Sequence, residues 1–82
     1  MPRFMDVHHL PGITKDKLAE AHAKDLSLQG KHGVKYLKYW FNEKTGKVYC
    51  LVEAPNADAA SAVHREAHGL VADELTEVKE GR

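Results

Sequence analysis

The sequence predicts an α+β fold in which an antiparallel four-stranded sheet carries two helices on one face. Two observations lead to this expectation. The chain has 82 residues, the size of one small domain. Its patterned segments follow the order strand, helix, strand, strand, helix, strand, with turn residues between them. We therefore expect a single domain spanning residues 1–82.

The first strand and first helix are predicted in residues 4–30. The segment 4–9 is apolar enough for a strand and is stopped by Pro11 and Gly12. Thr14 is a suitable N-cap, and Gly30 is placed to end the helix. Helical spacing puts five residues on one face: Leu18, Ala21, His22, Asp25 and Leu26.

A hairpin is predicted from segments 34–41 and 47–52, which a short polar loop containing Gly46 joins. Both alternating sets of the first segment are largely apolar, namely Val34, Tyr36 and Trp40 on one side and Leu37, Tyr39 and Phe41 on the other. A sheet that is apolar on both faces is covered on both faces. Because two helices cover one face, we expect a second subunit on the other, in a homodimer.

The second helix is expected to begin after Asn56 and to end at Gly69, and a short last strand follows over 74–78. This order is that of the ferredoxin-like βαββαβ fold. We expect its first and third strands to form the central pair and to run parallel. Two such sheets packed back to back would give a dimeric α/β barrel-like assembly.

The composition of the chain limits the kinds of partner and the cellular compartment that we expect. Twelve basic residues balance twelve acidic ones, and the two signs are interspersed, which argues against nucleic acid or an anionic membrane as a partner. One cysteine precludes a disulfide framework, and the N-terminal residues lack a long apolar run. We expect a cytoplasmic protein.

Histidine is the main chemical clue, with six residues. In VHREAHG, His64 and His68 are four apart, so both can face one metal ion from a helix. His68 also has a simpler explanation, because a histidine near a helix C-terminus can bond the last carbonyl groups.

The strand 4–9 decides which residues join them. If its Asp6 face meets the helices, four side chains converge between sheet and helices: Asp6, His8, His22 and His64. The opposite parity would send His9 inward. Imidazole and carboxylate donors suit Ni²⁺, Zn²⁺, Co²⁺ or Cu²⁺.

Four other residues are not among the main predicted metal ligands. Asp25 is interpreted as a carboxylate orienting an imidazole or as a solvated charge, and His32 as exposed. Cys50 is interpreted as a buried, inert residue. Glu53 is a weak candidate to reach His8 or His9.

No phosphate loop, CxxC or Ser-His-Asp motif is present, so catalysis is not demanded. The alternative function is a small-molecule-binding or enzymatic dimeric α/β barrel protein. It would use Asp6, His8, His22 and His64 as a general base or Lewis-acid site.

Four stretches, PRFMDVHH, LAEAHAKDL, YLKYWFNEKTGKVYCLVEAP and AVHREAHGLVADELTEV, resemble the DUF4242 family of small bacterial single-domain proteins. One member of that family is described as a nickel-binding protein from an actinomycete. The resemblance implies a ferredoxin-like fold, a dimer with a barrel-like core, and nickel bound by histidine-rich sites, and it draws attention to His8, His22, His64 and His68. With the geometry above, the predicted ligands of Ni²⁺ are Asp6, His8, His9, His22, His64 and His68. We expect metal sequestration, buffering or sensing rather than turnover.

Overall fold

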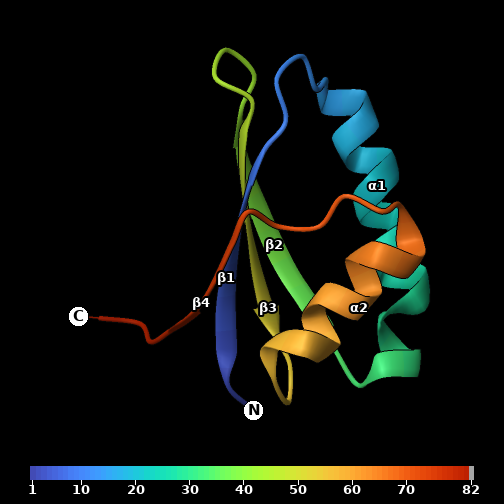
Figure 1. Ribbon diagram of the computed structural model, residues 1–82, viewed down its shortest axis with the longest axis vertical. Helices are drawn as coiled ribbons and strands as arrows, with labels where there is room; N and C mark the ends of the chain where they lie inside the picture. The colour runs from blue at the N-terminus through green and yellow to red at the C-terminus, as the bar shows by residue number, and fades with distance from the viewer. Residues whose placement is uncertain (82) are drawn as a thin grey trace.

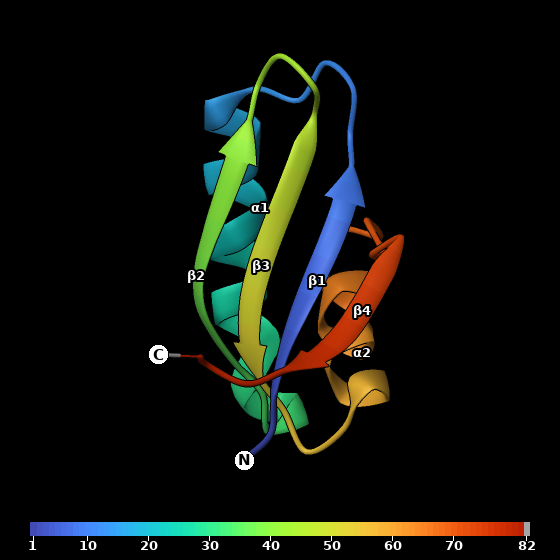
Figure 2. The ribbon, with the colours of Figure 1, turned by 90° about the vertical axis from the view of Figure 1, so that its left-hand side faces the viewer.

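The computed structural model describes residues 1–81 and has the expected α+β, ferredoxin-like order of elements. A four-stranded sheet is covered on one face by both helices, and its other face is open (Figures 1 and 2). No helix within these residues is long and apolar enough to cross a bilayer. The elements are β1 Arg3–His9, α1 Lys15–Leu28, the 3₁₀ turn η1 Gln29–His32, β2 Lys35–Asn42, β3 Lys47–Glu53, α2 Ala57–Ala67 and β4 Glu74–Val78.

The strand order is β2-β3-β1-β4, and all three pairings are antiparallel. The prediction that β1 and β3 form the central pair is confirmed, but the prediction that they run parallel is wrong. The connection through α1 brings β2 back in the direction of β1, and the tight hairpin then reverses β3 (Figure 2).

A β-bulge in β2 changes which residues share a face. The register with β3 shifts between Tyr36 and Lys38, so Tyr36 and Tyr39 both lie on the helix side, opposite Val52 and Cys50. Trp40 lies on the open side, opposite Tyr49. The expectation that Tyr36 and Trp40 share a face is therefore wrong, because strict alternation does not survive an extra residue.

The predicted N-caps are confirmed. Thr14 Oγ1 accepts a hydrogen bond from the Lys17 N–H at 3.2 Å, and Asn56 Oδ1 accepts one from the Ala59 N–H at 2.9 Å. At its other end α1 ends at Leu28, shortly before the predicted end at Gly30. The chain continues as η1 and turns at Gly33, whose φ of 68° is in the left-handed region.

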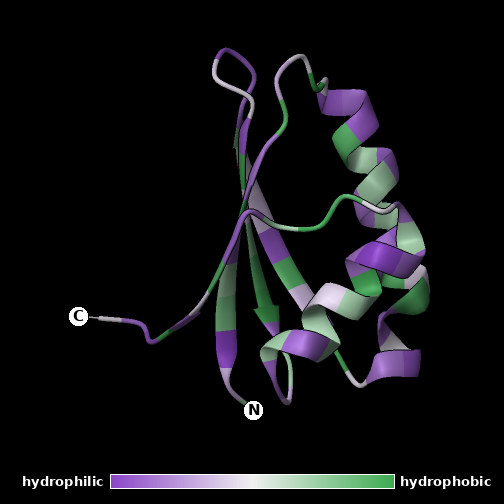
Figure 3. Ribbon diagram, in the orientation of Figure 1, coloured by the Kyte–Doolittle hydropathy of each residue, from purple (hydrophilic) through white to green (hydrophobic). Residues whose placement is uncertain are grey.

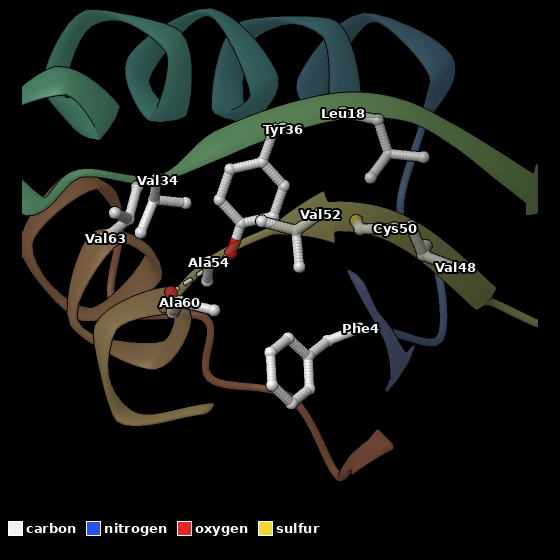
Figure 4. Packing of buried hydrophobic residues seen from close by; sticks show 10 residues of the cluster. All are labelled: Phe4, Leu18, Val34, Tyr36, Val48, Cys50, Val52, Ala54, Ala60 and Val63. Carbon is white, nitrogen blue, oxygen red and sulfur yellow. Dashed lines mark hydrogen bonds between the residues drawn. The ribbon is translucent and has the colours of Figure 1, made fainter. Parts of the chain in front are cut away.

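The core lies between the sheet and the helices. Phe4 of β1, Val52 of β3 and Val63 of α2 contribute to it, and the Tyr36 hydroxyl donates a hydrogen bond to the Ala60 carbonyl at 3.0 Å (Figure 4). Hydrophobic and hydrophilic residues intersperse along both helices, as expected for helices with one buried side (Figure 3). This layer also holds four buried polar or charged residues: Asp6, His8, Asp25 and His64.

Candidate metal centre

The parity of β1 places Asp6 and His8 on the helix side. Their exposed fractions are 1% and 3%, whereas His9 is exposed. Side chains alternate between the two faces of a strand, so Phe4, Asp6 and His8 lie on one face and Met5 and Val7 on the other. Because Phe4 packs in the core, Asp6 and His8 also face the helices. The first of the two alternatives predicted for this strand is the one observed.

His64 is the centre of the buried polar group. It projects from the last turn of α2, and its exposed fraction is 2%. Its Nε2 lies 2.8 Å from Oδ2 of Asp6 on β1, and its Nδ1 lies 2.9 Å from Oδ1 of Asp25 on α1. Because a carboxylate only accepts hydrogen bonds, both ring nitrogens donate, and His64 is an imidazolium in this arrangement.

One further histidine bonds each carboxylate. His8 Nε2 lies 3.1 Å from Asp6 Oδ1, and His68 Nε2 lies 3.0 Å from Asp25 Oδ1. His68 follows the last residue of α2, and its Nδ1 accepts the Leu70 N–H at 3.1 Å. The result is a continuous hydrogen-bonded chain of five side chains: His8, Asp6, His64, Asp25 and His68.

The pKa shifts follow from these contacts. Burial alone would lower the pKa of His64, but hydrogen bonds and charges from Asp25 and Asp6 outweigh it and raise the pKa to about 9. Burial alone would raise the pKa of Asp6, but the bonds from His64 and His8 lower it to about 2. The pKa of Asp25 is lowered in the same way by His64 and His68.

Two more side chains complete the surroundings of Asp6. The Tyr36 hydroxyl lies 3.5 Å from Asp6 Oδ2, and Cys50 is the β3 residue directly opposite Asp6. Burial and the nearby Asp6 charge raise the pKa of both Tyr36 and Cys50, so both are neutral at physiological pH.

Two groups of side chains could each hold a metal ion. In one, ligand atoms of Asp6, His8, Cys50 and His64 lie within 4.8 Å of one another; in the other, those of Asp25, His64 and His68 do. Nitrogen, oxygen and sulfur donors of this kind suit borderline-soft divalent ions. His8 Nδ1 is buried with no hydrogen-bond partner among the described residues.

A small cavity of about 30 Å³ adjoins both groups, and His8, His22, Asp25, Cys50, His64 and His68 are among its lining residues. This volume is enough for a water molecule or an ion. The residues therefore fit a bound transition metal.

Two predicted ligands lie outside both groups. The ring of His22 packs against Tyr39, with centroids 4.7 Å apart at the edge of the cavity, and burial lowers its pKa. His9 Nε2 donates to the Thr45 carbonyl at 3.1 Å, and its backbone N–H donates to Asp73. His9 thus ties β1 to neighbouring loops.

Three further sequence predictions can be compared with the structure. Asp25 orients two imidazoles, as one of its two alternatives predicted, and it is buried rather than solvated. Cys50 is buried as predicted, and its sulfur lies near the donor atoms of Asp6, His8 and His64. Glu53 is not near His8 or His9, because the antiparallel register pairs it with Arg3 at the other end of β1.

His32 was expected to be exposed. Its side chain is instead only 22% exposed, and its Nε2 lies 2.8 Å from Glu66 of α2. It lies outside both donor groups.

Comparison with known proteins shows the family of this chain. The family model described as "Nickel responsive protein SCO4226-like" matches residues 4–78. The crystal structure of SCO4226 from Streptomyces coelicolor A3(2) superposes with a TM-score of 0.91 at 41% identity, over 98% of this chain and 99% of that one. A search of the curated proteins gives no match. The chain belongs to the family of SCO4226-like nickel-responsive proteins.

Proposed function

We propose that this protein binds nickel, or a related divalent transition metal, in the buried layer between the sheet and the helices. The observation that carries the proposal is the group of Asp6, His8, Cys50 and His64. Ligand atoms of these four buried side chains, from three elements, lie within 4.8 Å of one another. The family description, nickel responsive, supports nickel as the ion.

Binding of a metal ion to this site would release protons from its ligands. An imidazole ligates through a lone pair, so His64 must release a proton before either of its nitrogens can bind an ion. Asp6 and Asp25, which bond His64 without metal, then supply carboxylate oxygens and keep the histidines oriented. The bound ion supplies the positive charge that the imidazolium provides in its absence.

The proposed role is sequestration, buffering or sensing of the ion in the cytoplasm. A reducing compartment suits a chain with one free, buried cysteine. The cavity of about 30 Å³ favours an ion over an organic substrate, since small-molecule pockets occupy about 300–1,000 Å³. This observation weighs against the enzymatic alternative.

We also propose a homodimer formed through the open face of the sheet. Its apolar residues include Trp40 and Tyr49, which are 47% and 38% exposed, together with Met5, Val7 and Leu51 on neighbouring strands. Two such faces packed together would make the barrel-like core expected from the sequence.

Titration calorimetry of the metal-free protein with Ni²⁺, Zn²⁺ and Cu²⁺ tests the site. We expect saturable binding that is tighter at about pH 7.5 than at about pH 6, with protons released. His64→Ala should abolish it, because both donor groups contain His64. His9→Ala, outside both groups, should leave it unchanged. Absence of saturable binding, or binding indifferent to His64→Ala, would refute the proposal.

A further inference from the structure

Cys50 lies at the centre of the sheet, on the side that faces the helices. In the strand register it is directly opposite Asp6 on β1 and Tyr39 on β2, and its exposed fraction is 8%. Its sulfur is one of the four ligand atoms that lie within 4.8 Å of one another. A small apolar residue would satisfy the packing alone, since the neighbouring positions of β3 that face the core are Val48 and Val52.

A second observation is a buried nitrogen atom of His8 that has no hydrogen-bond partner. His8 is 3% exposed, and its Nδ1 has no hydrogen-bond partner among the described residues. Its Nε2 faces a carboxylate, which only accepts, so Nε2 is the donor, and the tautomer with one ring hydrogen leaves the lone pair on Nδ1. A histidine whose other nitrogen is held by a carboxylate is the usual arrangement of a metal-ligating imidazole.

His8, Cys50 and His64 line the same small cavity. A thiolate among two imidazoles and a carboxylate makes a softer set of donors than nitrogen and oxygen alone. Such sets favour four-coordinate Zn²⁺, Co²⁺ or Ni²⁺ over hard ions such as Mg²⁺ or Ca²⁺, which prefer oxygen.

We propose that Cys50 is a thiolate ligand of the buried site, beside Asp6, His8 and His64, and that the site selects sulfur-accepting divalent ions. This inference rests on the proposed metal-binding function. When the ion enters, the S–H bond of Cys50 breaks, a metal–sulfur bond forms, and the proton passes to solvent. No electron is transferred, and the ion stays divalent.

Cobalt and nickel absorption spectra of the full chain test the proposal directly. The wild-type protein loaded with Co²⁺ should show a sulfur-to-metal charge-transfer band in the near ultraviolet. Cys50→Ser and Cys50→Ala should lose that band and bind the ion on the order of 10–100-fold more weakly. His9→Ala, which retains Cys50, should keep the band. Circular dichroism of both Cys50 variants reports whether they fold.

The outcomes separate this inference from the proposed function. Stoichiometric binding by calorimetry without a charge-transfer band in the wild-type protein would overturn the role of Cys50 and leave metal binding intact. A band that persists in Cys50→Ala would overturn it as well. Absence of any binding would refute the metal-binding function and the inference together. The wild-type spectrum is decisive even if both Cys50 variants fail to fold.

Discussion

His64 has a structural role in the metal-free protein and is also a proposed metal ligand. Its two nitrogens face two carboxylates from different elements, Asp6 of β1 and Asp25 of α1. Without a metal, its positive charge compensates the two buried negative charges, which would otherwise be costly. The same nitrogens are the donors that a metal requires.

The metal-free protein should therefore lose stability as the pH rises. The pKa of His64 is about 9 in the folded chain and about 6.5 when unfolded, so its contribution is complete below about pH 6.5. That contribution fades toward pH 9. We expect urea denaturation in the presence of a chelator to show a decrease of about 2–3 kcal/mol between about pH 6.5 and 8.5.

A matched pair of variants isolates this effect. His64→Asn should flatten the pH dependence over this range, whereas His9→Ala, which changes an exposed histidine, should retain it. Equal slopes in wild type and His64→Asn would contradict the assignment.

Asp25→Asn should weaken metal binding on the order of 10–100-fold, because the carboxylate is both a candidate ligand and the partner that orients His64 and His68. Asp16→Asn on the exposed first turn of the same helix is the control. Calorimetric titration with Ni²⁺ measures both. Similar affinities for the two variants would show that Asp25 is not part of the site.

The pattern of single residues predicted much of this cluster. Asp6, His8 and His64 were expected together, given one of two strand parities, and both helix N-caps were found from Thr14 and Asn56. Asp25 was underestimated because helical spacing puts it on the apolar side but does not tell a buried position from a rim position. Its partner, His64, is 39 residues away, and only the packing of α1 against α2 brings the two together.

At the level of elements, the β2–β3 hairpin holds the loop that follows β1. The Leu10 N–H donates to the Gly46 carbonyl at 2.7 Å, and Leu10 also lines the cavity. A Cβ at Gly46 would lie 2.7 Å from the carbonyl carbon and oxygen of Leu10, and the φ of Gly46 is +77°. The hairpin tip therefore requires glycine both for conformation and for space.

Gly46→Ala should lower the free energy of unfolding by about 2–4 kcal/mol, because backbone strain and a backbone clash add. Gly12→Ala is a matched control: its φ is also positive, +83°, but a Cβ there meets nothing within 4 Å. Its cost should be only about 1 kcal/mol. Urea denaturation compares them, and equal losses would mean that the close approach to Leu10 does not matter.

Strict alternation does not predict the bulge in β2. Each alternating set of that strand contains apolar residues together with a lysine, Lys35 in one and Lys38 in the other, so neither set is distinguished as the polar one. Its consequence matters for the site, because Tyr36 and Tyr39 both point to the helix side. Tyr36 reaches Asp6 there, and Tyr39 packs on His22.

For the whole molecule, the order of elements determined the sheet and its covered face from the sequence. The hairpin correctly predicted that β3 runs antiparallel to β2. Only the direction of β3 relative to β1 was predicted wrongly. The proposed dimer would form through the face of the sheet that the helices leave uncovered. Trp40 and Tyr49 pair there across adjacent strands. An exposed apolar patch of this kind is unfavourable in water, which supports the proposed homodimer.

Trp40→Lys or Tyr49→Lys should shift the protein toward a monomer and raise the dimer dissociation constant by at least about tenfold, because a charge replaces buried apolar area. Glu20→Lys, exposed on α1, should leave the assembly unchanged. Sedimentation velocity at several concentrations measures the distribution. A wild-type protein that sediments as a monomer at all concentrations would refute the proposed dimer.

The candidate ligands come from β1, β3, α1, α2 and the residue that follows α2, and they extend in sequence from Asp6 to His68. They meet only in the folded chain, so an ion that binds them stabilises the native state by mass action, about 2.7 kcal/mol at a free concentration of 100 times Kd. The melting temperature of this protein would then increase with the concentration of free metal. Turnover of the protein in the cell would decrease accordingly, and its abundance would follow the concentration of the available ion.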